Sequence, residues 1–387
     1  MPPPVSDCDP VTYATRQPVP IVYVQGSHYE MGRQVGVHRR EVIHTTLGTY
    51  RGLFQSEAVR LQIHSWGEAI LHARKYLPFA EESMPQYVEE LRGIADGARL
   101  DFNDLLVLNC MEAITEDALH RGCTSLAVSP ELTTHGALLI GHNEDWLPED
   151  FESVYLIHAQ PDDEPAFLAI TYGGLLPNIG FNQHSIAQCC DSVYPNDARV
   201  GVPRIFVSRA VLAAKTPADA IKAALHRRRA AGYNHLIAHA SGEIYNVEVS
   251  ARDFELIYGL DGVVAHTNHY ISRHMRAIER NSEELIGSRV RYNRAVRLLH
   301  NQQGQISRAS IQALLSDHVN FPESICNHVS LDDYPLDRQQ TIAALVMDLT
   351  NLTMEVAWGT PCCSEFHTYR LEAVPMVNSQ WSMVNGQ

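Results

Sequence analysis

A glycine followed directly by a cysteine, Gly122-Cys123, stands between a mainly helical region and a region of short β-rich runs. Glycine allows backbone conformations that a side chain forbids, so strain at this bond could help the thiol attack the preceding carbonyl. Hydrolysis of the resulting thioester would split the chain. The new terminus would carry both a thiol and an α-amine, and an α-amine of pKa about 7.7–8.0 can accept the thiol proton. The pair predicts a self-processing cysteine nucleophile that needs no histidine base.

A buried structural cysteine is the plain alternative for Cys123, since most free cysteines are structural. The chain has eight cysteines, including the vicinal pairs Cys189-Cys190 and Cys362-Cys363, with no CxxC spacing and no regular framework. We therefore expect reduced thiols that are mostly buried.

Several ordered stretches decide between the two interpretations. Residues 122–125 and 136–146 resemble the N-terminal nucleophile hydrolases of the isopenicillin N acyltransferase family, and more distantly the choloylglycine hydrolases. Matching pieces in the family's order are residues 26–32, 180–186, 233–237, 266–269 and 288–289. Such a set is more specific than any single motif. The resemblance covers about residues 20 to 360 and implies an α+β fold, a four-layer αββα sandwich of two stacked, mainly antiparallel sheets.

The resemblance also implies roles for particular residues. Cys123 would be the nucleophile for both self-cleavage and catalysis. Asp145 would hold the α-amine or the thiol in position, and Asn234 would donate to the oxyanion, a contribution of about 2.7–4 kcal/mol. Ser288 and Arg289 match a pair near the acyl pocket, with Arg289 supplying positive charge to Asp145 or to substrate.

Each role has a structural alternative. Asp145 could be a turn residue, and Asn234 an ordinary strand-edge amide. Ser288 could cap the helix that follows. Arg289 lies among other arginines and could belong to a solvated helix face.

Two departures from the family pattern affect the expected substrate site. His142 stands where the bile-salt-cleaving relatives carry arginine, so we assign it only a supporting or substrate-contacting role. Asp191-Ser192 stands where many relatives have asparagine, which leaves the second oxyanion donor open.

The implied reaction is acyl transfer from a small N-acyl amine or N-acyl amino acid through a Cys123 thioester, to water rather than to an amine, without a cofactor. In the family the leaving groups include penicillin nuclei and biogenic amines conjugated to β-alanine. Cleavage would give an N-terminal helical fragment, residues 1–122, and a catalytic fragment, residues 123–387, which together form one structural unit. The alternatives are an uncleaved member of the fold that binds a small molecule and a metal-dependent hydrolase. The spacing His266-x2-His269-x4-His274 matches no strong zinc motif, so we expect no metal.

The elements that must position these residues follow the order helices, strands, helices, strands, helices, strands. Helical patterns cover much of residues 29–115, with Asp101 as a favoured N-cap. Strands are expected at residues 20–24, 123–128, 137–142, 154–159, 166–172, 234–240, 243–249, 254–258, 262–266, 342–348 and 353–358, with helices at 203–214, 217–229 and 278–315. Hairpin signals such as Ser241-Gly242 argue against a parallel doubly wound sheet.

The amino-acid composition limits the classes of binding partner. The 387 residues carry 30 Lys+Arg against 45 Asp+Glu, a net charge of -15, which argues against nucleic acid or anionic membranes. A hydrophobic share of 45% can fill a large core. No apolar run approaches the ~18 residues of a membrane span, and residues 1–7 lack a signal-peptide pattern. We therefore expect a cytoplasmic enzyme.

Overall fold

Two β-sheets form the centre of the molecule. The computed structural model describes residues 14–115, 122–280, 283–302, 304–330, 332–334 and 337–372. The eight-stranded sheet has the order β1 (Ile21–Gly26), β4 (Val154–Pro161), β5 (Phe167–Tyr172), β6 (Ile179–Asn182), β7 (Ile186–Asp191), β8 (Tyr233–His239), β9 (Ile244–Val249), β10 (Phe254–Tyr258). The six-stranded sheet has the order β11 (Val263–His266), β2 (Cys123–Val128), β3 (Leu139–Trp146), β12 (Gln340–Asp348), β13 (Thr353–Trp358), β14 (Phe366–Arg370). Neighbouring strands are antiparallel except for β1 and β4.

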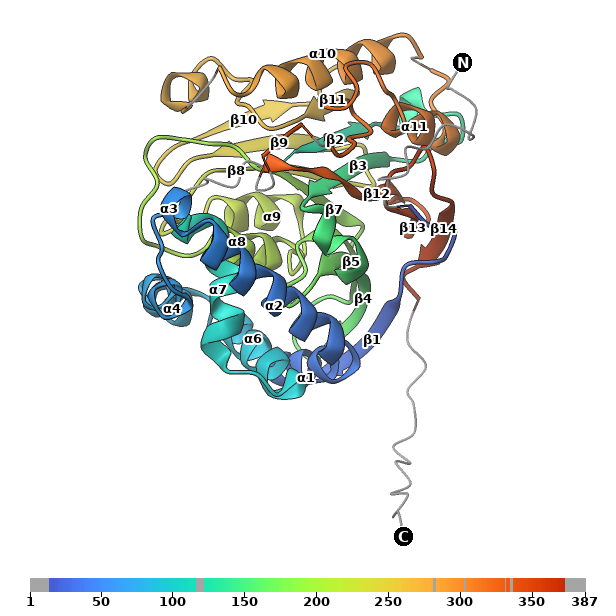
Figure 1. Cartoon of the computed structure of the whole chain (residues 1–387). Coiled ribbons are helices and arrows are strands. Elements are labelled where there is room, and N and C mark those ends of the chain that lie inside the picture. Colours follow the sequence, from blue (N-terminus) through green and yellow to red (C-terminus); the bar gives the residue numbers. More distant parts are fainter. Residues whose placement is uncertain are drawn as a thin grey trace.

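Helices cover both outer faces. The first group is α1 (His28–His38), α2 (Arg40–Ser56), α3 (Ala58–Leu61), α4 (Trp66–Ala73), α5 (Leu77–Ser83), α6 (Pro85–Ala98), α7 (Phe102–Ile114), α8 (Arg204–Val211) and α9 (Pro217–Ala224). The second is α10 (Ile286–His300) and α11 (Arg308–Leu315). Short 3-10 helices lie at Pro130–Leu132, Pro148–Ser153 and Met275–Ile278. Figure 1 shows the first group beside the eight-stranded sheet and α10 and α11 over the six-stranded one, which confirms the αββα sandwich.

Strand alternation sets which side chains meet between the sheets. Successive side chains of a strand point to opposite faces. Ala127 of β2 and Ile140 of β3 belong to the core cluster shared with the eight-stranded sheet. Leu126 and Leu139 instead pack in a second cluster with α10 and α11. Every residue of β2, β3 and β12 is buried, so polar side chains on these strands must find partners inside the protein.

Most expected elements are present. β2 has the predicted bounds, and the Asp101 side chain accepts a hydrogen bond from the Asn103 N–H as the N-cap of α7. Strands β6, β7 and β14 lie outside the expected strand ranges, and the helical region expected over residues 278–315 contains α10 and α11. No helix in the described ranges is long and apolar enough to cross a membrane.

The cysteines largely match the expected reduced state. Free thiols are found at Cys110, Cys123, Cys189, Cys190, Cys326 and Cys362, all but Cys362 buried. Cys363 is disulfide-bonded, which corrects the expectation that all the thiols are reduced. Cys8 lies outside the described residues.

Candidate active site

The first residue of β2 is Cys123, and it lies opposite Glu144 of β3. Alternation from Ala127 and Ile140 places Cys123, Ser125, His142 and Glu144 on the face between the two sheets. Asp145, next along β3, lies on the face covered by α10 and α11.

The Gly122–Cys123 peptide is held by hydrogen bonds on both sides. The N–H of Gly122 donates to Gln339 Oε1 at 2.6 Å, and its carbonyl oxygen accepts from the backbone N–H of Asp145 at 3.0 Å. The N–H of Cys123 donates to Asn268 Oδ1 at 2.8 Å. A Cβ on residue 122 would lie 2.8 Å from Asp145 Oδ2 and 3.1 Å from Asp145 Cβ, so any other residue here would displace the Asp145 side chain. The peptide is therefore fixed with its carbonyl already polarised by a donor.

Asp145 lies beside this peptide with an incompletely paired carboxyl group. Its Oδ1 accepts from the Thr341 hydroxyl at 2.6 Å, whereas Oδ2 is buried with no hydrogen-bond partner among the described residues. Burial raises the pKa of Asp145 to about 6, although the Arg291 charge opposes the shift. The carboxyl group is thus close to Gly122 and can change protonation near neutral pH.

The Cys123 thiol is enclosed and surrounded by acidic groups. Its Sγ lies 3.8 Å from Glu144 Oε2, and Glu144 Oε1 accepts from the Tyr172 hydroxyl at 3.2 Å. Burial, followed by the charges of Glu144 and Asp191, raises the pKa of Cys123 well above its ordinary value. In the uncut chain the sulfur is therefore a thiol at neutral pH, and its activation requires a base.

A line of buried polar groups leads away from Glu144 between the sheets. His142 Nε2 lies 3.0 Å from Glu144 Oε2, and His142 Nδ1 lies 2.9 Å from Ser125 Oγ. Ser125 donates to Asp191 Oδ1 at 2.8 Å. Because this hydroxyl has one proton, Nδ1–H of His142 must donate to it, and the Glu144–His142 contact then requires a proton of its own.

The line continues across the second sheet. Asp191 Oδ2 lies 3.4 Å from His266 Nδ1, and His266 Nε2 lies 3.0 Å from Glu248 Oε1. Although burial alone would lower it, the nearby carboxylates of Asp191 and Glu248 raise the pKa of His266 to about 9. Of the two contacts, the one with Glu248 is a hydrogen bond. His266 of the six-stranded sheet therefore lies between two carboxylates of the eight-stranded sheet, whose negative charges favour its protonated form.

Asn234 lies on β8 directly opposite Asp191 of β7. Its Nδ2 donates to Asp191 Oδ2 at 2.9 Å and to Asn246 Oδ1 at 3.2 Å. Both N–H groups are thus engaged, and Oδ1 is buried without a partner in the described part of the chain. To donate to an oxyanion, the amide must give up one of these bonds.

The two residues predicted near the acyl pocket have different environments. Ser288 is buried, and its Oγ accepts from the Asn268 N–H at 2.8 Å and lies 2.8 Å from His269 Nδ1. It is not the N-cap of α10, which is Leu285. Arg289 pairs with Glu279 at 2.6 Å. Its guanidinium group is thus paired with Glu279 in this structure, and the role expected for Arg289, supplying charge to Asp145 or to substrate, stays a prediction.

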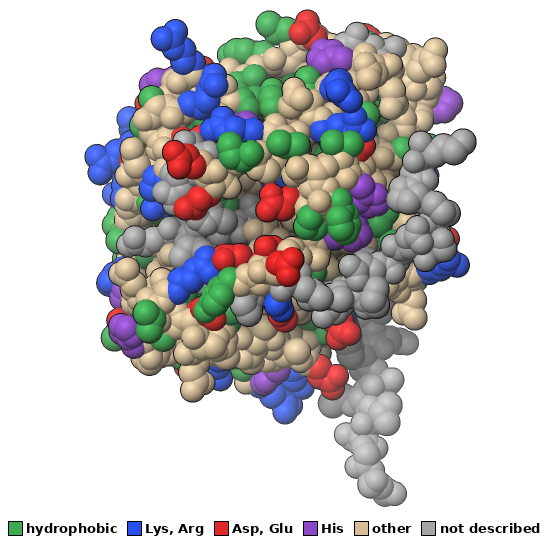
Figure 2. Space-filling model, turned by 45° about the horizontal axis from the view of Figure 1, so that its top comes forward, with side chains coloured by type: hydrophobic (Ala, Val, Ile, Leu, Met, Phe, Trp, Pro, Cys, Tyr) green, Lys and Arg blue, Asp and Glu red, His purple; other side chains and the backbone are tan. Residues whose placement is uncertain are grey.

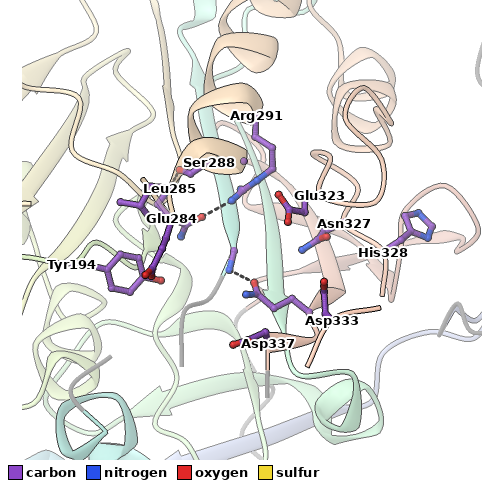
Figure 3. A pocket seen from close by; sticks show the side chains of 14 residues that line it. Tyr194, Glu284, Leu285, Ser288, Arg291, Glu323, Asn327, His328, Asp333 and Asp337 are labelled. Carbon is purple, nitrogen blue, oxygen red and sulfur yellow. Dashed lines mark hydrogen bonds between the residues drawn. The ribbon is translucent and has the colours of Figure 1, made fainter. Parts of the chain in front are cut away.

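The arginine at the site is Arg291, two residues beyond Arg289 on the same helix. Its Nη1 donates to the carbonyl oxygen of Cys123 at 2.5 Å and to Thr124 Oγ1 at 3.1 Å, and its Nη2 donates to Asn268 Oδ1 at 2.8 Å. Figure 3 shows Arg291 reaching from α10 toward the strand that begins at Cys123. Glu144 and Asn268 were not predicted from the sequence. Alternation along paired strands from Cys123 could have indicated Glu144.

Two cavities adjoin the peptide. A cavity of about 30 Å³ is lined by Cys123, Glu144, the aromatic residues Trp146, Tyr172 and Tyr233, and the end of α7. A larger one of about 130 Å³ is lined by Gly122, Asn268, Ser288 and Arg291. Its acidic residues are Glu284, Glu323, Asp333 and Asp337. Figure 2 shows acidic side chains around the hollow in the middle of the viewed face.

The histidines considered for a metal do not converge. His266 contacts Asp191 and Glu248, His269 contacts Thr267 and Ser288, and His274 contacts Asp253. Within the described ranges, the donors that do converge at the active site are Cys123, His142 and Glu144.

Two stacked antiparallel sheets between helical layers, with a cysteine opening an inner strand, are the architecture of the N-terminal nucleophile hydrolases. The chain belongs to the acyl-coenzyme A:6-aminopenicillanic acid acyl-transferase family, whose model matches residues 132–362. The matched region begins after Cys123.

Two individual proteins with related activities in their names are similar to this chain in sequence. A β-alanyl-dopamine/carcinine hydrolase of Drosophila melanogaster is 30% identical over 235 residues, which is 54% of this chain and 57% of that protein. The 40 kDa form of an acyl-coenzyme A:6-aminopenicillanic-acid-acyltransferase of Emericella nidulans is 24% identical over 344 residues, 88% and 92% of the two chains.

Solved structures give weaker similarity. Penicillin V acylase from Agrobacterium tumefaciens has a TM-score of 0.43 and 12% identity, covering 60% of this chain and 82% of its own. A mutant conjugated bile acid hydrolase from Clostridium perfringens has a TM-score of 0.43 and 12% identity, covering 66% and 100%.

Proposed function

We propose that the protein cuts itself between Gly122 and Cys123 and then hydrolyses a small N-acyl amide through a Cys123 thioester. The observation that carries this proposal is the Asp145 N–H bonded to the Gly122 carbonyl. A donor already aimed at the carbonyl oxygen of the peptide to be cleaved stabilises negative charge as it develops there.

Self-cleavage proceeds in two steps. The Cys123 sulfur attacks the Gly122 carbonyl carbon, a C–S bond forms, the C–N bond breaks, and the released nitrogen becomes the α-amine of Cys123. Water then attacks the thioester, which frees the Gly122 carboxylate and restores the thiol. Glu144 lies 3.8 Å from the sulfur and is the group placed to accept its proton as the C–S bond forms; the leaving nitrogen takes up one proton as the C–N bond breaks, so no net proton is gained or lost.

The matured enzyme uses the new amine as its base. The nitrogen of Cys123 lies 2.8 Å from Asn268 Oδ1, so an amine formed there keeps an acceptor that orients it toward its own sulfur. Arg291 in turn holds Asn268 and the Cys123 carbonyl oxygen. The thiolate attacks the substrate amide, the amine product leaves with the transferred proton, and water releases the acyl group.

Asn234 is the proposed oxyanion donor. Its N–H to Asp191 is the bond that can be exchanged, since Asp191 keeps contacts with Ser125 and His266 when this N–H turns to the oxyanion. Asp145 and Ser288 then support the site from the α10 side, and His142 supports Glu144.

The lining of the site favours a small substrate with an ammonium group. Tyr172 lines the cavity beside the sulfur, and Glu144 offers a carboxylate 3.8 Å from it. The Tyr233 ring is stacked by the Arg204 guanidinium, 4.5 Å from the ring centroid. Arg204 in the same cavity is paired with Glu112 of α7. A β-alanyl amide carries such an ammonium group, as the name of the Drosophila relative indicates for its substrate. Because α7 forms one wall, the N-terminal fragment must stay bound after cleavage.

Mass spectrometry and a substrate panel test this function together. Purified protein should give two fragments, the second beginning at Cys123, instead of one chain of 43.3 kDa. The matured protein should hydrolyse β-alanyl amines faster than neutral N-acyl amino acids or penicillins, with hydroxylamine added as a competing acceptor to trap the thioester. An intact chain that binds these compounds without turnover would support a binding protein instead.

A further inference from the structure

A second group of potential ligands lies outside the active site. Cys326 and His328 are buried, and His318 and Cys362 are half-buried. One donor atom from each of the four side chains lies within 4.8 Å of the others. His318 Nε2 is 3.2 Å from His328 Nε2, which is also 3.4 Å from Cys326 Sγ and 3.5 Å from Cys362 Sγ.

Hydrogen bonding does not account for this arrangement. A single ring nitrogen of His328 is close to three donor atoms at once, yet a neutral imidazole nitrogen carries either one proton or one lone pair. It can therefore satisfy one of its three neighbours in full.

A tetrahedral metal ion accounts for all of these distances. Zinc binds histidine nitrogen at about 2.0–2.1 Å and cysteine sulfur at about 2.3 Å. In a regular tetrahedron these lengths separate two nitrogens by about 3.3 Å and a nitrogen from a sulfur by about 3.6 Å. The observed separations of 3.2, 3.4 and 3.5 Å agree. We propose that Cys326, Cys362, His318 and His328 bind one zinc ion.

The donor set selects this metal. Two thiolates and two imidazoles in tetrahedral array suit zinc, whereas magnesium and calcium require oxygen ligands. All four positions are filled by protein, which is typical of a structural rather than a catalytic site.

The site would connect two segments that are distant in sequence. His318, Cys326 and His328 lie in the loop between α11 and β12, and Cys362 follows β13. The Phe321 ring lies 5.1 Å from the His328 ring and 6.1 Å from the His318 ring, so it shields the imidazoles from one side. Zinc would therefore fasten this loop to the connection between β13 and β14.

The loop also reaches the peptide that the protein cuts. Asn327, between two of the ligands, donates its N–H to Thr341 Oγ1 at 3.0 Å and accepts the Thr341 N–H at 3.1 Å. Thr341 Oγ1 donates to Asp145 Oδ1. Figure 3 shows His328 turned away from the other labelled side chains and Asn327 turned toward them. Zinc at this position would hold Asp145 in place through two intervening residues.

Metal analysis of the full chain without a histidine tag tests the proposal. Protein produced in zinc-supplemented medium should contain one zinc ion per chain, measured by inductively coupled plasma mass spectrometry. After chelation, Co²⁺ should restore one equivalent and give the visible spectrum of a tetrahedral site with thiolate ligands. The chelation and cobalt experiment uses the wild-type protein, so it does not depend on whether a variant folds. Thermal unfolding should occur at a lower temperature in the chelated protein and return on adding zinc.

Variants locate the ion. Cys362→Ser and His318→Gln should lose most of the bound zinc, whereas His72→Gln, a half-buried histidine of α4, should keep it. Cys363 is disulfide-bonded and cannot replace Cys362. Folded protein without metal, a Cys326–Cys362 disulfide in peptide mapping, or full zinc content in both ligand variants would overturn the proposal. These outcomes are independent of self-cleavage, which is scored separately by mass.

Discussion

The backbone N–H of Asp145 donates a 3.0 Å hydrogen bond to the carbonyl oxygen of Gly122, although the two residues are far apart in sequence. The pairing of β2 with β3, which sets Cys123 opposite Glu144, brings them together. The Asp145 carboxyl is at the same time so close to Gly122 that a side chain at position 122 would displace it. One residue thus polarises the proposed cleavage site and disfavours a larger residue before the cysteine.

Replacing the nucleophile should stop both reactions. Cys123→Ala should remain a single chain and lose turnover by at least about a thousandfold, because both steps need the sulfur. Intact mass and steady-state rates measure this. Cys189→Ala, at another buried free thiol, is the matched control and should mature normally. Turnover by Cys123→Ala above background would require another nucleophile.

Asp145 should make stability depend on pH. Its pKa is about 6 in the folded protein and 3.8 ordinarily, so ionisation favours the unfolded chain. The contribution of its protonated form is complete below about pH 4 and is lost as pH rises through about 6, a change of about 3 kcal/mol. In a Cys123→Ala background, Asp145→Asn should remove this change. Denaturant unfolding at several pH values measures it, and parallel curves for the two proteins would contradict the assignment.

Two arginines on α10 should behave differently. Arg291→Met should slow self-cleavage about tenfold to a hundredfold, since about 1.5–3 kcal/mol of charge-assisted hydrogen bonding to the Cys123 carbonyl and Asn268 is lost. Arg289→Met breaks the pair with Glu279 and should have a smaller effect. The decay of freshly translated precursor on gels gives both rates. A larger defect in Arg289→Met would support the assignment made from the sequence.

His266 should stabilise the contact between the sheets at neutral and acidic pH. Its pKa is about 9 in the folded protein and 6.5 ordinarily. The contribution, about 3 kcal/mol, is complete below about pH 6.5 and is lost as pH rises through about 9. The difference in unfolding free energy between the wild-type protein and His266→Gln should therefore become smaller as pH rises from about 6.5 to about 9. His274→Gln, at an exposed histidine near Asp253, is the control. A difference in unfolding free energy between wild type and His266→Gln that does not change with pH would contradict the proposed charge on His266.

Local sequence determined much of the architecture. Apolar runs predicted most strands, because a strand buried on both faces needs apolar side chains on both. The strands that were not predicted are β6, which has only four residues, β7, in which Ile186 is the one β-branched residue, and β14, whose residues are partly or fully exposed. The glycine-cysteine pair at the start of β2 was visible because it combines a rare chemistry with a change of element type.

Only the tertiary structure decided which side chains meet. Arg289 and Arg291 are two residues apart, and about 100° of rotation per residue turns them to opposite faces of one helix, so the docking of α10 on its sheet chooses between them. The proposed zinc ligands come from two loops joined by paired strands, a juxtaposition that spacing cannot reveal. Composition and hydrophobic pattern determine which segments form helices and strands. The packing of those segments determines which charges and hydrogen bonds surround Cys123, because these groups come from distant parts of the chain.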